Sequence, residues 1–169
     1  MDRVDERIFT LEEDESSYRR WNAVAELTYC DDNEKSKEAV LAALTNDDSS
    51  IVRRTCAEYF GVNSHDIALR PLIAALRDED ENVRRAAARA LTTGYRSYEG
   101  LERVFIVAMD EDIYREVAVL SLAEIGGEDS LGPLEALLNG KGRTIREFAS
   151  MAKSKILRRM KENDRQQIP

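Results

Sequence analysis

Arginines recur along this sequence at a nearly constant interval. The first interval is 34 residues and the next three are 31 residues each, which gives an arginine ladder of Arg19, Arg53, Arg84, Arg115 and Arg146. A short acidic or polar turn precedes each ladder arginine. Because a planar guanidinium forms bidentate hydrogen bonds with carboxylates, such a series could bind an anionic ligand or fasten the chain's own turns. We favour the second role, in which the ladder arginines bond the turns of the chain with Asp47, Asp78 and Asp110 as their partners.

The position directly after each ladder arginine differs between the two halves of the sequence. On a helix this position shares a face with the residue four positions later. In the first three repeats the face is basic, and we define the basic strip as Arg20, Arg54, Arg85 and Arg89. In the last two repeats the face is acidic and apolar, with Glu116, Leu120, Glu147 and Met151. We interpret the strip and the two apolar residues as candidate partner-binding residues, with a solvated face as the alternative.

The single tryptophan, Trp21, follows the first arginine of the basic strip. Tryptophan is common at binding interfaces because it combines a large apolar ring with a polar N–H group. Trp21 is therefore either an interface anchor or a cap over the first helix pair, and the sequence leaves both interpretations open.

Residue types that carry catalytic chemistry are sparse. The one histidine, His65, falls at the start of an expected helix, where we interpret it as a capping or solvated residue, so no metal site is expected. The segment NGKGR (139–143) lacks the flanking strand of a phosphate loop. Cys30 and Cys56 are expected to be thiols. We expect no catalytic residue and no cofactor, and we favour a protein that is not an enzyme.

The residues between the arginines predict paired helices. Within 66–94, apolar residues recur at helical spacing, an acidic turn follows, and an alanine-rich helix ends near Gly94. Three residues after the ladder arginine the side chain is small in four repeats, whereas the first repeat has Asn22. The same pattern predicts five helix pairs, at 3–30, 37–61, 66–94, 99–127 and 132–160. We expect one all-α domain over residues 1–160 and a frayed tail over 161–169.

Charge is distributed unevenly along the 169 residues. The net charge of −8 argues against a general nucleic-acid binder, whose affinity comes from neutralising phosphates. Residues 1–17 carry a local charge of −5 and residues 153–165 carry +4. The basic segment is either a solvated cap or a docking segment for an acidic partner. The apolar runs are too short to span a bilayer, so we expect no membrane contact and a cytoplasmic protein.

Two long segments resemble a known repeat family. RPLIAALRDEDENVRRAAARAL (70–91) and VAVLSLAEIGGEDSLGPLEALL (117–138) are similar to HEAT repeats, specifically the HEAT-like type named after phycobilisome lyases. The resemblance implies an α-solenoid of about five helix pairs, an armadillo-like superhelix whose second helices line the concave side. Di-iron hydroxylases of the wider class use repeated His-Glu pairs, which this sequence lacks.

The resemblance implies several functions. Members of the class act as scaffolds, bilin lyase subunits, DNA glycosylases or regulators. We favour a non-enzymatic scaffold or adaptor that binds a protein partner on its concave face. The first alternative is a bilin lyase subunit or chromophore chaperone, with an apolar pocket and arginines for the propionates of the bilin. The second alternative is a nucleic-acid-binding protein that uses the basic strip.

Overall fold

The computed structural model describes residues 2–29 and 34–166, and every regular element in them is helical. Cys30 lies outside the described residues. The chain divides into two compact units, Met1–Tyr95 (unit 1) and Arg96–Pro169 (unit 2), which are described one at a time. The single domain expected over residues 1–160 stays a prediction.

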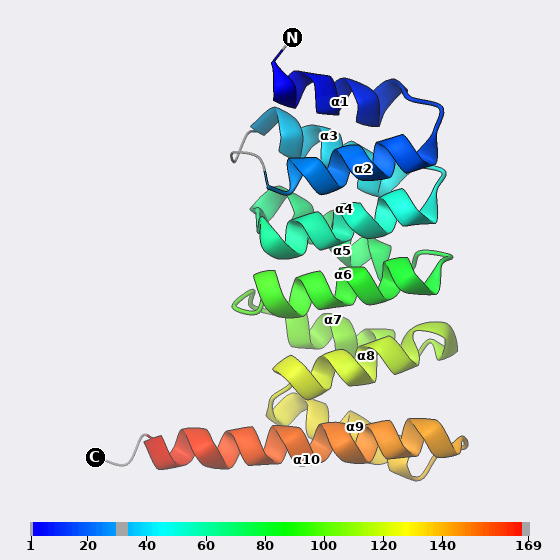
Figure 1. The fold of residues 1–169 in the computed structure, drawn as a ribbon. Helices are drawn as coiled ribbons and strands as arrows, with labels where there is room; N and C mark the ends of the chain where they lie inside the picture. The colour runs from blue at the N-terminus through cyan, green and yellow to red at the C-terminus, as the bar shows by residue number, and fades with distance from the viewer. Residues whose placement is uncertain (1, 30–33, 167–169) are drawn as a thin grey trace. The chain divides into compact units, whose positions relative to one another are not determined.

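Unit 1 consists of three helix pairs arranged in two layers (Figure 1). The first helices of the pairs form one layer: α1 (Arg3–Glu13), α3 (Glu34–Asn46) and α5 (Leu69–Ala75), which follows a short 3-10 turn, η1 (Asp66–Ala68). The second helices form the other layer: α2 (Ser17–Leu27), α4 (Ser50–Val62) and α6 (Glu81–Gly94). Adjacent helices within each layer are in contact, so the unit is built by stacking pairs.

The amino-acid pattern of α6 shows why these helices form and pack. Its N-terminus is capped by the Asp80 carboxylate, which accepts hydrogen bonds from the backbone N–H groups of Asn82 and Val83. An apolar stripe that includes Val83 is fully buried. Where α6 meets α4, a Cβ atom added to Gly61 would lie 3.2 Å from the Cα of Ala90. Small residues thus permit the close approach of the two helices.

Unit 2 consists of two further helix pairs. The first is α7 (Leu101–Ala108) with α8 (Asp112–Ile125), and the second is α9 (Leu131–Leu138) with α10 (Arg143–Gln166), preceded by a 3-10 turn, η2 (Glu128–Ser130). The Glu102 carboxylate tethers the turn before α9, because it accepts hydrogen bonds from the Gly127 N–H and the Ser130 hydroxyl. Helix α10 packs against both α8 and α9.

Helix α10 is longer than the sequence predicted. Its buried face ends at Ile156, and Arg159 then donates a hydrogen bond of 2.8 Å to the carbonyl oxygen of Glu124, near the end of α8. The helix continues to Gln166, so the expectation of a frayed tail from residue 161 is wrong for residues 161–166. The guanidinium bond stabilises the helix at Arg159, and the segment beyond it includes the helix-favouring residues Met160, Lys161, Glu162, Arg165 and Gln166.

Candidate functional site

Arginines near the start of the second helices hold the turns that precede them. The guanidinium of Arg53 donates to the carbonyl oxygens of Asp47 (2.9 Å) and Asp48 (3.2 Å). Arg84 makes the equivalent bonds, both 2.9 Å long, to the carbonyl oxygens of Asp78 and Glu79. In unit 2, two arginines bond a carbonyl six positions earlier: Arg115 to Met109 (2.8 Å) and Arg146 to Gly140 (3.0 Å).

In unit 1 two arginines, Arg20 and Arg53, also reach the turn of the next repeat. Arg53 forms two hydrogen bonds of 2.8 Å with the carboxylate of Asp78. Arg20 forms the same pair of 2.8 Å bonds with the carboxylate of Asp47. Because each of these aspartates also offers its carbonyl oxygen to the following arginine, the contacts form a continuous network: Arg20, Asp47, Arg53, Asp78 and Arg84.

The first repeat has a different register from the one predicted. Arg20, and not Arg19, bonds the carbonyl oxygens of the preceding turn, at Asp14 (3.0 Å) and Glu15 (3.2 Å). The side chain of Arg19 is 71% exposed and contacts only the Asp14 carboxylate among the described residues, at 3.3 Å. Arg20 therefore belongs to the ladder and not to the basic strip, and the ladder is Arg20, Arg53, Arg84, Arg115 and Arg146.

With the corrected register, the residue three positions after the ladder arginine is small in every repeat. Three residues after the ladder arginine the first repeat has Ala23, where the predicted register gave Asn22. The residues at this position are at most 1% exposed in all five repeats: Ala23, Cys56, Ala87, Ala118 and Ala149. Burial raises the pKa of the Cys56 thiol well above its usual value, so Cys56 is a neutral core residue.

The two bidentate aspartates are ionised in spite of their burial. Burial by itself would raise the pKa of Asp47, whose side chain is 6% exposed, but hydrogen bonds from Arg20 and from the Ser49 N–H lower it further than burial raises it. The pKa of Asp78 is lowered in the same way, against the effect of burial, by Arg53 and by the Asp80 N–H. The network is thus a series of desolvated ion pairs with additional hydrogen bonds on each carboxylate.

An apolar pocket lies at the surface of α2 and α4. It has a volume of about 280 Å³ and is lined by Ser17, Tyr18, Trp21 and Ile51. The rings of Tyr18 and Trp21 lie with their centroids 5.4 Å apart, tilted by 45°. Tyr18 is 69% exposed and Ile51 is 57% exposed, and both lie in this one pocket, so they form an exposed apolar patch. Sequence reasoning missed both, although each lies two positions before a corrected ladder arginine.

Arginines of the same helix layer continue this surface. Counted from the corrected ladder, Trp21, Arg54 and Arg85 occupy the same position on α2, α4 and α6. Arg54 is paired with Glu58 (3.1 Å) and Arg85 with Glu81 (2.7 Å), both along their own helices and both exposed. Arg89 is exposed one turn after Arg85. We define the docking face as Tyr18, Trp21, Ile51, Arg54, Arg85 and Arg89.

The remaining candidate residues belong to unit 2. Leu120 on α8 is half-buried, whereas Met151 on α10 is 48% exposed. They are not part of the docking face, which lies wholly in unit 1.

His65 precedes η1 at its N-cap position. The side chain of His65 does not cap η1, and its Nε2 atom lies 3.7 Å from the Glu34 carboxylate. Across residues 2–29 and 34–166, no cluster of three or more histidine, cysteine or acidic side chains is arranged to hold a metal ion.

The sequence of the third to fifth helix pairs is similar to a known family of repeats. Residues 69–152 match the model for HEAT repeats. These residues form a HEAT-repeat domain. The predicted all-α fold of paired helices is confirmed. None of the curated proteins compared with the chain is a match. Within the described residues, no helix is both long enough and apolar enough to cross a membrane.

Neighbouring arginines test the corrected register. Arg20→Ala and Arg53→Ala should each lower the free energy of unfolding by about 3 kcal/mol, because each leaves a buried carboxylate without its partner. Their neighbours provide matched controls: Arg19→Ala and Arg54→Ala remove exposed guanidinium groups and should cost at most about 0.5 kcal/mol. Denaturant titration monitored by circular dichroism measures all four. Equal losses of unfolding free energy for Arg20→Ala and Arg19→Ala, and for Arg53→Ala and Arg54→Ala, would contradict the assignment.

The network also predicts how stability depends on pH. The pKa of Asp78 is lower in the folded protein than its value of about 3.9 in the unfolded chain. The ionised Asp78 therefore contributes its full stabilisation above the unfolded pKa, and this stabilisation is lost as the pH falls through the folded pKa. Thermal melts between about pH 6 and pH 3 should therefore show a shallower acid-side loss for Asp78→Asn than for the wild type. Asp66→Asn removes an exposed charge and should keep the wild-type slope. Identical slopes for all three proteins would refute the stabilising ionisation of Asp78.

Proposed function

We propose that this HEAT-repeat protein is an interaction module that binds a protein segment on the docking face of unit 1. The observation that carries the proposal is the exposed aromatic pocket of Tyr18 and Trp21, with Ile51 as its third apolar wall and arginines at equivalent positions beyond it. Tyrosine, tryptophan and arginine are the residue types that dominate binding energy at protein interfaces. The ladder supports this use, because it orders the three helices that carry the face.

The face indicates the chemistry of the segment it would bind. An apolar side chain would fill the pocket, while carboxylates placed toward α6 would pair with Arg54, Arg85 and Arg89. Glu58 and Glu81 already pair with Arg54 and Arg85, so the carboxylates of a partner must compete with these two glutamates. The arginines therefore contribute more to the specificity of binding than to its affinity. An acidic segment with an aromatic or aliphatic anchor fits both requirements.

The two alternatives have less support. The pocket on the docking face has a volume of about 280 Å³, below the roughly 300–1,000 Å³ typical of small-molecule sites, and it is open, which disfavours a bilin. A nucleic-acid site would require a strong local excess of positive charge. Arg20 is engaged in the ladder, and Arg54 and Arg85 have acidic partners, so the basic strip carries much less net charge than its arginines suggest.

Selection from a displayed peptide library tests the proposal. Peptides selected on the immobilised wild-type protein should combine an aromatic or aliphatic residue with two or more acidic residues. Their affinity should fall at least about tenfold, or 1.4 kcal/mol, for Trp21→Ser and for the triple variant Arg54→Ala, Arg85→Ala and Arg89→Ala.

The controls separate loss of binding from loss of folding. Both variants should keep the wild-type thermal midpoint, and Arg103→Ala, an exposed arginine of unit 2, should bind the peptides normally. Peptides that bind the triple variant and Trp21→Ser as well as they bind the wild type would eliminate the docking face. Pigmented protein after co-expression with a bilin and an apo-phycobiliprotein would instead favour the lyase alternative.

A further inference from the structure

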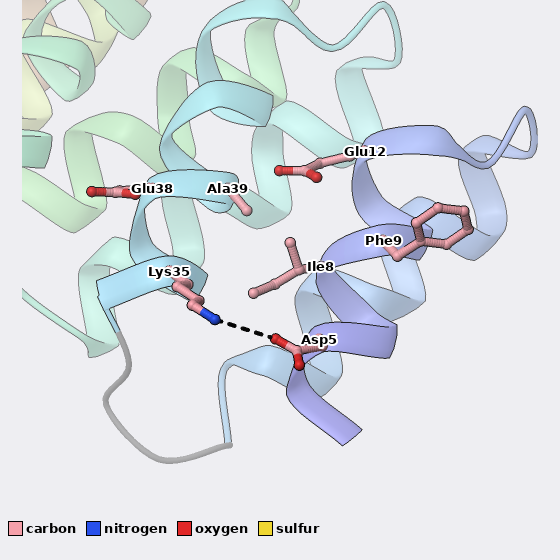
Figure 2. Close-up of a pocket in the computed structure, with 7 residues that line it drawn as sticks. All are labelled: Asp5, Ile8, Phe9, Glu12, Lys35, Glu38 and Ala39. Atoms are coloured by element: carbon pink, nitrogen blue, oxygen red, sulfur yellow. Dashed lines mark ion pairs between the residues drawn. The ribbon is translucent and has the colours of Figure 1, made fainter. Parts of the chain in front are cut away.

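A second surface, on the other helix layer of unit 1, has an apolar floor and an acidic edge. A groove between α1 and α3, with a volume of about 470 Å³, is lined by Ile8, Phe9 and Ala39 together with charged residues. A smaller pocket of about 240 Å³ continues it along the same two helices, over Ala42 and Ala43. Figure 2 shows Ile8 between the helices, facing Ala39. The alanines of α3 leave room for an additional helix to approach.

The charge at this groove is negative. Asp5 and Lys35 form an ion pair of 3.7 Å at one end, which leaves Glu12 and Glu38 as its exposed acids (Figure 2). Neither glutamate has an ion-pair partner among the described residues. The surrounding segment, residues 1–17, has seven acidic and two basic side chains. An occupant of the groove must therefore be basic on its flanks and apolar toward the floor.

The end of α10 has those properties. Beyond Ile156, the last buried residue of the helix, residues 157–166 carry four basic and two acidic side chains. The side chain of Arg158 is 73% exposed and lies 3.9 Å from the Glu162 carboxylate of its own helix, and Lys161 is exposed three positions after Arg158. Leu157 and Met160 have the same three-residue spacing and form a short apolar stripe beside the basic residues. This amphipathic segment is already helical, so little ordering entropy would be lost when it docks.

We propose that the end of α10 from one copy of the chain docks in the α1–α3 groove of a second copy. Leu157 and Met160 cover Ile8 and Phe9, while Arg158 and Lys161 pair with Glu12 and Glu38. The two surfaces are different patches of the same chain, so the contact is heterologous and extends into chains or closes into rings. This contact does not involve the docking face and is independent of the proposed function.

Charge reversal on each side gives a direct test. Sedimentation velocity of the full 169-residue chain should show a faster species that grows with protein concentration and weakens as salt rises, since screening shortens from about 10 Å at 0.1 M to about 3 Å at 1 M. Glu12→Lys with Glu38→Lys, and separately Arg158→Glu with Lys161→Glu, should each abolish the faster species. An equimolar mixture of the two variants should restore it, because each groove then meets an end of opposite charge.

Matched controls exclude a general effect of charge. Glu99→Lys with Glu128→Lys changes the net charge by the same amount at exposed sites that do not line the groove and should assemble as the wild type does. Every variant is checked by circular dichroism for an unchanged thermal midpoint. A monomer at all concentrations, a compaction independent of concentration, or a mixture that fails to reassemble would each overturn the proposal.

Discussion

The bidentate pairing of an arginine with the aspartate of the next turn is the contact on which unit 1 depends. A helix pair cannot bury its apolar stripe alone and must stack on its neighbours, but apolar contacts by themselves are non-directional and tolerate sliding. The guanidinium of Arg53 donates two hydrogen bonds to the Asp78 carboxylate and fixes it in one position, and the carbonyl oxygen of Asp78 accepts a hydrogen bond from Arg84. Each turn is thereby aligned with the one before it and the one after it.

This network also determines which residues remain available for binding. Ladder arginines point into the turns, so their neighbours one position later point outward from the same helix layer. Trp21, Arg54 and Arg85 are therefore presented side by side on three adjacent helices. The opposite layer, built from the first helices, has a different character, since α1 and α3 combine small residues with acids. Two layers with different chemistry allow the unit to present two independent surfaces.

The repeat period in the sequence was sufficient to predict the helix pairs, because the arginine, the acidic turn and the small residue recur together. It was not sufficient to place the first repeat. Two adjacent arginines, Arg19 and Arg20, both satisfy the pattern, and only the distances to Asp47 and to the turn carbonyls distinguish them. The pocket of Tyr18 and Ile51 depends on that register, so it could not be inferred before the correction. The length of α10 was missed because residues 161–166 are all polar and have no periodic apolar signal, whereas the tertiary bond from Arg159 is invisible in the sequence.

The most direct test of the ladder is a double-mutant cycle on Arg53 and Asp78. Free energies of unfolding are measured for the wild type, Arg53→Ala, Asp78→Ala and the double variant. Because the two side chains share a desolvated bidentate contact, we predict a coupling energy of about 1.5–3 kcal/mol, with the double variant much less destabilised than the sum of the single variants. Additive losses, with a coupling energy below about 0.5 kcal/mol, would contradict a ladder that aligns the repeats.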